Sequence, residues 1–183
     1  MSTPAIIAAI HQLPSMTDRC LGLIIQHELA DQYADWTFDS LVSIGIPPER
    51  AKQLPAEAKL IRLEPAAAAL NKGNIHVITT ADAQYPRLLK EIHSAPPVIY
   101  VRGNPAVLNQ PSLGVVGTRF PSEYGLAAVQ RLLRPVVERG INIVSGLAIG
   151  IDAAAHQTAL DYGGPTAAIF GTGVDRVYPA HHR

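Results

Sequence analysis

The chain has 183 residues, of which 48% are hydrophobic and 16% charged, with 15 basic and 15 acidic side chains. This composition predicts a folded globular protein and excludes disordered and fibrous chains. The net charge of zero removes the simplest argument for a nucleic-acid-binding protein, although a local basic site stays compatible with it.

The sequence predicts a soluble cytoplasmic protein without a metal site. Its one cysteine, Cys20, cannot form an internal disulfide, fits a reducing compartment and has no matching ligand cluster for a metal. The apolar run 6–10 lacks a preceding basic region and is too short for a signal peptide. No apolar run approaches the roughly 20 residues of a membrane-spanning helix, so we expect no membrane partner.

Residues 1–73 show the spacing of short helices and predict a small all-α domain. Apolar residues recur three and four positions apart in segments 6–13 and 21–29. Thr17 and Asp39 are of the residue types that cap helix N-termini, and we expect helices to begin after them.

Residues 41–51 predict two helices joined by a tight turn at Gly45. Such a hairpin either presents backbone amides to a DNA phosphate or forms a plain helical corner. The first 70 residues carry eight acidic and five basic side chains, which favours the corner.

Residues 74–183 predict an α/β domain with a parallel, Rossmann-like sheet. A strand, a short helix and a second strand lead in over residues 75–103. A β-α-β-α-β pattern follows, whose crossovers we expect to be right-handed. Its strands are predicted at 113–117, 141–145 and 166–170, and its helices at 122–138, begun by Ser122 as cap, and 152–162. Pro135 lies inside the first of these helices and predicts a bend or an early end.

All three strands of this pattern end in glycine and a hydroxyl residue. The carboxyl ends of parallel strands share one edge of a sheet, so the loops that follow them are expected to converge there. Glycine lets the backbone approach a ligand closely, and helix N-termini favour anions. The sequence therefore predicts a phosphate-binding site at this edge.

Several side chains near these loops have two interpretations. Arg119 either binds phosphate through its guanidinium fork or pairs with Glu123. Asp152 and His156 share a helix face. They form either an acid–base pair, or a helix cap at Asp152 whose carboxylate also steadies His156.

Three other residues near the loops stay equally open. Asp175 either accepts from a sugar hydroxyl or fixes its own loop. Phe120 and Tyr124 either stack on a base at the crevice or simply pack. The fingerprint G-x-G-x-x-G and the P-loop are both absent, so we expect no nucleotide cofactor.

The order of these motifs resembles the DNA processing protein A (DprA/Smf) family. The similar segments are Gly114-Val-Val-Gly-Thr-Arg119 with Tyr124-Gly125, Ser145-Gly-Leu-Ala-Ile-Gly-Ile-Asp152 with Ala155-His156, Gly171-Thr-Gly-Val-Asp175 with Tyr178-Pro179, and the lead-in from Ile78-Thr79 to Arg102-Gly103-Asn104. The resemblance covers residues 75–183 well. Over the N-terminal helices it is loose and consistent with the family's SAM-like or helix-hairpin domain.

This resemblance implies a non-enzymatic protein that binds single-stranded DNA in natural transformation and competence and loads the RecA recombinase. No cofactor and no catalytic residue is implied. The implied phosphate-binding residues are Gly117, Thr118, Arg119, Ser145, Gly146, Gly150, Asp152, Gly171, Thr172 and Gly173. A homodimer is implied for full-length members, and RecA as a partner in DNA recombination.

The chain stops at Arg183, where the family's domain continues, so we expect a fragment with an incomplete Rossmann-like domain that has lost the dimer and binds DNA weakly. A nucleotide-binding enzyme of the phosphoribohydrolase (lysine-decarboxylase-like) type is the alternative, because its fold also begins with a Gly-Ser/Thr-Arg turn. The later Pro-Gly-Gly segment of those enzymes does not occur here.

Overall fold

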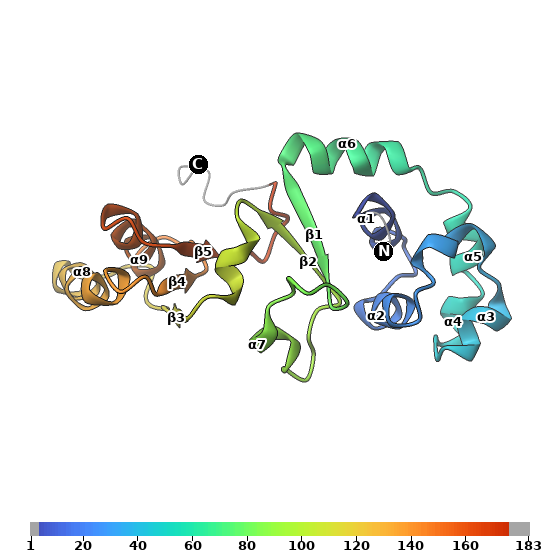
Figure 1. Ribbon diagram of the computed structural model, residues 1–183, viewed down its shortest axis with the longest axis horizontal. Coiled ribbons are helices and arrows are strands. Elements are labelled where there is room, and N and C mark those ends of the chain that lie inside the picture. The colour runs from blue at the N-terminus through green and yellow to red at the C-terminus, as the bar shows by residue number, and fades with distance from the viewer. Residues whose placement is uncertain (1–3, 176–183) are drawn as a thin grey trace. The chain divides into compact units, whose positions relative to one another are not determined.

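The structure is a computed structural model that describes residues 4–175 (Figure 1). The chain divides into two compact units, Met1–Gly103 and Asn104–Arg183. Each unit has a hydrophobic core of its own. No helix among the described residues is long and apolar enough to cross a bilayer.

The first unit is mainly helical, as the apolar spacing predicts. Its helices are α1 (Pro4–His11), α2 (Asp18–Gln26), η1 (Ala30–Asp35), α3 (Phe38–Ser43), α4 (Pro48–Ala51), α5 (Leu54–Ala58) and α6 (Leu63–Gly73). Their shared core contains fully buried aliphatic side chains, among them Ile10, Leu21, Ile24, Leu41 and Leu54. Packing of these amphipathic faces stabilises helices that are too short to form alone.

Caps set where two of these helices begin. The Thr17 hydroxyl accepts from the amide of Cys20, so the cap predicted at this position is confirmed. The cap predicted at Asp39 is wrong, because α3 begins at Phe38 and is capped by Thr37 in a reciprocal capping box with Ser40. Threonine and aspartate are both favoured as N-cap residues, so residue type alone did not choose between the two positions.

The turn after α3 has the form expected of a helical corner. Gly45 has a φ of +92°, which favours glycine, and Ile46 is buried in the core. The amides of Gly45 and Ile46 donate to the carbonyls of Val42 and Leu41. These amides are therefore occupied within the turn, which favours the corner over a phosphate-binding hairpin.

A two-stranded antiparallel ribbon completes the first unit. Strand β1 (Ile75–Thr79) pairs with β2 (Val98–Arg102), and the short helix α7 (Arg87–Lys90) lies in the connection between them. The strand–helix–strand lead-in is thus formed as predicted. The ribbon belongs to the same compact unit as the helices, and this unit ends at residue 103. The domain boundary that we predict from the sequence lies at residue 73 and stays a prediction.

The second unit is a three-stranded parallel sheet with helices in its crossovers. Its elements are η2 (Pro105–Asn109), β3 (Ser112–Gly114), α8 (Glu123–Val137), β4 (Asn142–Ser145), α9 (Ile151–Asp161) and β5 (Thr166–Ala168). The strands pair in the order β3-β4-β5, with β3 at one edge. Leu133 and Val137 of α8, Ile143 of β4, and Ala155 and Ala159 of α9 form the core.

The mixed α/β fold with a parallel sheet is confirmed, and the elements of the second unit match the predicted ranges within a few residues. Strand β3 is shorter than predicted and ends at Gly114 rather than Gly117. Ser122 caps α8 by accepting from the amide of Gly125, as predicted. Pro135 lies in the last turn, and α8 ends two residues beyond it, at Val137.

Candidate nucleic-acid interface

The first candidate loop follows β3 and is exposed. The backbone amides of residues 116–119 make no hydrogen bond with any described part of the chain. Val116 is 88% exposed, and Gly117, Thr118 and Arg119 are exposed as well. Four consecutive unbonded amides beside an arginine form a concentrated set of donors, which suits an anion with several acceptor oxygens.

Arg119 lies within this donor set and is free to take a ligand. Its guanidinium forms no ion pair with Glu123, nor with any other acidic side chain among the described residues. Thr118 accepts from the amide of Phe120 through its hydroxyl oxygen, which leaves the hydroxyl proton available to a ligand. The ion pair between Arg119 and Glu123, which was the alternative role for this arginine, is therefore not formed.

The second loop, between β4 and α9, packs against the first loop. The amide of Ile151, the first residue of α9, donates to the carbonyl of Thr118 at 3.1 Å. A Cβ atom on Gly117 would lie 2.6 Å from the side chain of Ile151, and one on Gly150 would lie 2.8 Å from Cα of Arg119. These two glycines are required so that the loops can touch, and Gly150 also has a φ of +88°.

Ser145 and Asp152, which we expected at the phosphate, have partners within the fold. Ser145 is 5% exposed, and its hydroxyl donates to the carbonyl of Val115 at 2.7 Å. The carboxylate of Asp152 accepts from the amide of Gly146 at 3.1 Å. Both contacts hold the second loop in shape, so these side chains position the loop.

His156 is buried against the third strand of the sheet. Its Nδ1 atom lies 2.7 Å from the hydroxyl of Thr166, and that hydroxyl donates to the carbonyl of Ile143. Nδ1 therefore carries the proton and donates to Thr166. Both residues thus have partners within the fold, which favours a structural interpretation over an acid–base pair. The cap expected at Asp152 is wrong, because Gly150 is the residue before α9 and the carboxylate of Asp152 accepts from the amide of Gly146 instead.

The third loop follows β5 at the same edge of the sheet. A Cβ atom on Gly146 would lie 3.9 Å from the carbonyl oxygen of Ile169, so the second and third loops are neighbours. Gly171, Thr172 and Gly173 are exposed. The carboxylate of Asp175 lies against Gly173, where a Cβ atom would meet it at 2.5 Å, which favours the loop-fixing role. The three loops converge as the parallel sheet predicts.

A groove of about 890 Å³ lies beside Arg119. One wall comes from the first loop and α8, and the other from the second loop and α9. The lining residues are Arg119, Phe120, Pro121, Leu126, Leu147, Gly150, Ala153, Ala154, His156, Gln157 and Leu160. Sequence reasoning placed Phe120 near a crevice but did not find its apolar far wall, because the alanines of α9 carry no chemical signal.

Asn142 is a residue that the sequence did not single out. It is fully buried at the start of β4, and its Nδ2 atom donates to the carbonyl of Val107 at 3.2 Å and to the hydroxyl of Ser112 at 3.0 Å. Asn142 therefore joins η2 and β3 to β4 at the edge of the sheet opposite the loops. An asparagine at the start of an apolar strand was the available signal, since such a residue is seldom buried without partners.

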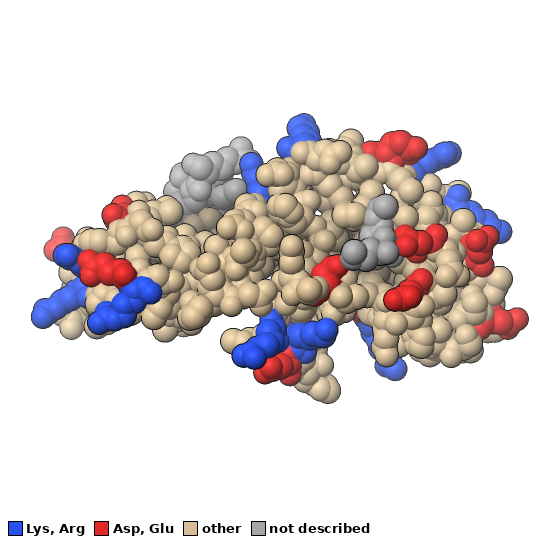
Figure 2. All heavy atoms as spheres, viewed as in Figure 1, with Lys and Arg blue, Asp and Glu red and all other residues tan. Residues whose placement is uncertain are grey.

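Basic and acidic residues are equal in number in the chain. Figure 2 shows basic and acidic side chains interspersed on the face in view, without a broad surface of one sign. The candidate anion site is therefore the exposed donor set of the first loop alone, which is compatible with the net charge of zero.

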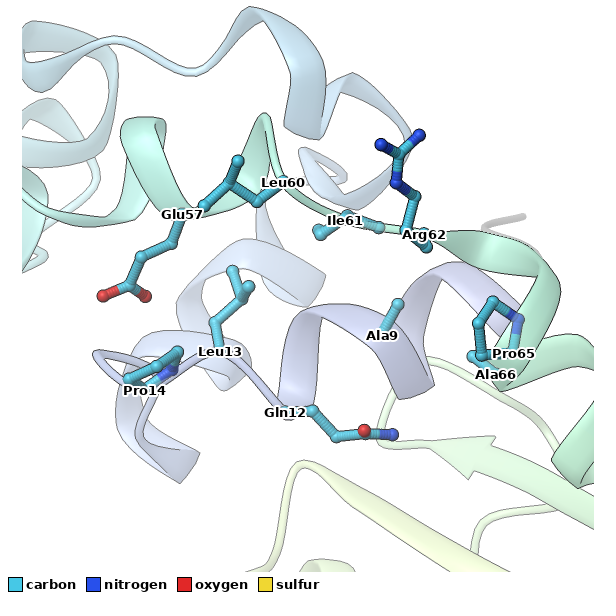
Figure 3. A pocket seen from close by; sticks show the side chains of 10 residues that line it. All are labelled: Ala9, Gln12, Leu13, Pro14, Glu57, Leu60, Ile61, Arg62, Pro65 and Ala66. Carbon is cyan, nitrogen blue, oxygen red and sulfur yellow. The ribbon is translucent and has the colours of Figure 1, made fainter.

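The helical unit has a smaller hollow of about 280 Å³ between α1, α5 and α6 (Figure 3). Leu13, Leu60 and Ile61 line it, and Arg62 points away from it into solvent. The carboxylate of Glu57 accepts from the amide and the hydroxyl of Ser15. The carboxylate of Glu57 is thus engaged within the fold, whereas Arg62 is exposed beside the hollow.

Comparisons with known proteins agree with the arrangement of the loops. The family model described as DNA recombination-mediator protein A matches residues 76–183. The chain belongs to this family. The match begins at β1, so it includes the ribbon and all three loops of the candidate interface, and the expected DprA/Smf membership is confirmed.

Curated relatives match more than half of the chain. Protein Smf of Synechocystis is 43% identical over 60% of this chain and 29% of its own length. DNA processing protein DprA of Streptococcus pneumoniae is 45% identical over 54% of this chain and 34% of its own. This chain therefore spans about a third of the length of these relatives.

Two solved structures share the fold. DprA of Streptococcus pneumoniae matches the whole chain and 62% of its own, with a TM-score of 0.76 and 31% identity. DprA of Helicobacter pylori matches 58% of this chain and 47% of its own, with a TM-score of 0.51 and 26% identity. The Helicobacter pylori protein has a single-stranded DNA binding mode that is described as unique.

Proposed function

We propose that this chain binds the backbone of single-stranded DNA at the loop between β3 and α8. The observation that carries the proposal is the exposed segment 116–119, where unbonded amides adjoin a guanidinium without an ion pair among the described residues. Phosphate oxygens accept hydrogen bonds from such amides, and arginine binds them bidentately.

The ten predicted site residues divide into three roles in this proposal. Gly117, Thr118 and Arg119 contact one phosphate directly. Gly171, Thr172 and Gly173 are exposed in the loop after β5. They contact the phosphate of the next nucleotide. Ser145, Gly146, Gly150 and Asp152 hold the second loop against the first through the contacts described above.

The relatives support a role in DNA processing. Several of them carry that name, and the DprA of Helicobacter pylori binds single-stranded DNA. We extend the proposal to a recombination mediator of natural transformation that acts in the cytoplasm, forms homodimers and loads RecA. These activities concern the whole protein, of which this chain is about a third by comparison with its curated relatives.

We also propose that the protein acts without catalysis. The two residues that most resembled an acid–base pair, Asp152 and His156, are used in holding the loop and the sheet. A phosphoribohydrolase would release free base from nucleoside monophosphates. Incubation with each nucleotide, followed by chromatography of the free base, tests this, and sustained release would overturn the non-enzymatic proposal.

The decisive experiment measures the anisotropy of a labelled oligothymidylate titrated with the protein at several salt concentrations. Arg119→Ala should lower the affinity about 10-fold or more, because a charge-assisted contact is lost. The slope of log affinity against log salt should fall by about 0.7, the value for one phosphate of a single strand.

Arg131→Ala is the matched control, because Arg131 is an exposed arginine of the same unit that does not line the groove. It should leave both affinity and slope unchanged. Equal losses in the two variants would show that arginines act through net charge only, and an unchanged affinity in Arg119→Ala would remove the proposed site.

A further inference from the structure

The hollow of the helical unit has a size suited to one large apolar side chain. Its volume of about 280 Å³ is at the lower limit of sites that enclose a drug-sized molecule, which begin at about 300 Å³. Ala9 and Leu13 line one side, and Leu60 and Ile61, between α5 and α6, line the other (Figure 3). A single large side chain that fills such a hollow is a common anchor of a protein–protein interface.

Leu60 extends the apolar surface of this hollow into solvent. It is 78% exposed, whereas its neighbours Leu13 and Ile61 pack against the core of the helical unit. An exposed leucine is common on its own, but here it continues the lining of a concave apolar surface. Contact with an apolar side chain of a partner would remove this surface from water, which is favourable.

The edge of the hollow offers positive charge to a ligand. Lys59 and Arg62, on either side of Leu60 in the chain, are both exposed, and neither forms an ion pair with any described residue. Glu57 is the acidic residue that lines the hollow, and its carboxylate accepts from the amide and the hydroxyl of Ser15. The cations are therefore available to a partner, whereas the carboxylate is already used within the fold.

We propose that this hollow binds a segment of a partner protein in which one large apolar side chain is flanked by carboxylates. The apolar side chain fills the space between Leu13 and Leu60, and the carboxylates lie against Arg62. Gln12 is exposed at the same hollow, and its side-chain amide makes no hydrogen bond with the described part of the chain, so it pairs with the backbone of the segment.

The chemistry of the hollow favours a peptide over the other ligands of this protein. Its lining is aliphatic and offers no aromatic surface on which a nucleobase could stack. The site lies in the first compact unit, whereas the proposed DNA-binding loop lies in the second. The inference therefore goes beyond the proposed function and does not depend on it.

The test is an amide NMR titration of the isotope-labelled chain with three synthetic peptides, acetylated and amidated to remove their terminal charges. The first has one phenylalanine with two aspartates on each side, the second has lysines in place of the aspartates, and the third has alanine in place of the phenylalanine. The first should shift the resonances of Leu13, Leu60 and Ile61 in a saturable way. The lysine peptide should bind about threefold or more weakly through loss of an exposed ion pair, and the alanine peptide about 10-fold or more weakly through loss of the anchor.

Variants of the chain test the two parts of the site separately. Arg62→Glu should reverse the charge preference, so that the lysine peptide binds more tightly than the aspartate peptide. Leu60→Ala should weaken both phenylalanine peptides about 3- to 10-fold. The matched controls are Arg19→Glu and Leu88→Ala, because Arg19 is an exposed arginine and Leu88 a 71% exposed leucine of the same unit, and neither lines the hollow.

Several outcomes would overturn the peptide site. Absence of saturable shifts at millimolar concentrations of the first peptide would do so, as would equal binding of the aspartate and lysine peptides. Shifts of the same resonances on concentrating the chain alone would identify a second copy as the occupant instead. Binding of N-acetyl-phenylalanine amide as tightly as the first peptide would show that the hollow takes a small molecule and that the flanking carboxylates contribute nothing.

Discussion

A Cβ atom on Gly150 would overlap the carbonyl oxygen of Thr118. Gly150 is the residue before α9, and Thr118 lies in the exposed loop after β3. The amide of Ile151 donates to that same carbonyl, so the start of α9 and the first loop form one rigid corner. The shape of the candidate phosphate site therefore depends on a residue that carries no chemical group.

Gly150→Ala should destabilise the second unit by about 3 kcal/mol or more, because a side chain there meets both an unfavourable positive φ and the backbone of the first loop. Gly140→Ala is the control: Gly140 has a φ of +74°, but its Cβ would meet nothing within 4 Å, so only the conformational cost of about 1 kcal/mol applies. Urea unfolding followed by circular dichroism measures both. Equal losses would mean that the contact with Thr118 is unimportant.

Ser145→Ala should lower the stability of the second unit by about 1–2 kcal/mol, because the carbonyl of Val115 loses its buried donor. DNA affinity, measured well below the unfolding midpoint, should stay within about twofold of wild type if the hydroxyl only positions the loop. A loss of affinity as large as that of Arg119→Ala would show that Ser145 binds phosphate directly.

Much of the second unit followed from local pattern, because its core is local in sequence. Leu133 and Val137 are four apart within the helix predicted at 122–138, and Ile143 lies in the strand predicted at 141–145, so the elements that carry this core followed from periodicity. The direction in which Ser145 points did not follow, since one residue of register reverses the face of a strand. Its acceptor, the carbonyl of Val115, lies 30 residues away and is brought close only by strand pairing.

Asn142→Ala should destabilise the second unit by about 2–3 kcal/mol. The substitution removes a buried amide that joins Val107 and Ser112 to the start of β4, and it leaves the carbonyl of Val107 without that donor. Ser112→Ala removes the link from Asn142 to Ser112, and the bond from the Ser112 hydroxyl to the carbonyl of Gln110, but it leaves the link to Val107. Because Ser112 is exposed, this should cost less than about 1 kcal/mol. Unfolding by urea with circular dichroism distinguishes the two, and similar losses would contradict the role of Asn142.

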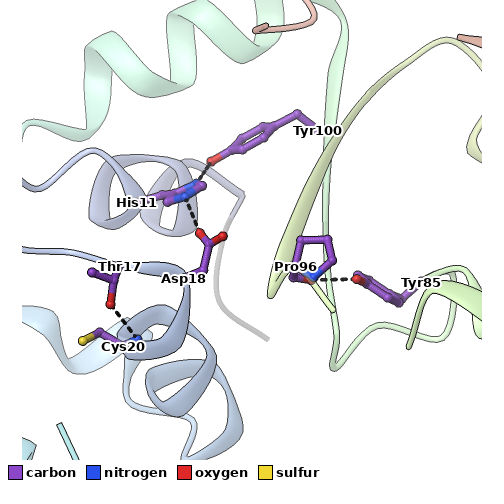
Figure 4. A network of polar contacts seen from close by, with 7 residues as sticks. All are labelled: His11, Thr17, Asp18, Cys20, Tyr85, Pro96 and Tyr100. Carbon is purple, nitrogen blue, oxygen red and sulfur yellow. Dashed lines mark hydrogen bonds and ion pairs between the residues drawn. The ribbon is translucent and has the colours of Figure 1, made fainter. Parts of the chain in front are cut away.

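Tyr100 gives the first unit a pH dependence in the alkaline range. Its hydroxyl shares a hydrogen bond of 3.0 Å with Nδ1 of His11, whose Nε2 lies 3.4 Å from the carboxylate of Asp18 (Figure 4). Burial, with a smaller effect of the Asp18 charge, raises the pKa of Tyr100 from 10.0 to about 12. The folded state therefore keeps this proton more tightly than the unfolded state.

The contribution of Tyr100 to stability should be complete below pH 10 and decline as the pH rises toward 12, because only the unfolded chain ionises at first. By about pH 11 the loss relative to neutral pH should be on the order of 1 kcal/mol, reduced by solvent that reaches the half-buried ring. Tyr100→Phe should remove this decline and cost about 1 kcal/mol at neutral pH through the lost hydrogen bond.

Urea unfolding followed by fluorescence of Trp36, the single tryptophan and a core residue of the same unit, measures both effects. Tyr124→Phe, at an 83% exposed position of the other unit, should behave as wild type, and an alkaline decline that persists in Tyr100→Phe would assign the effect to another group.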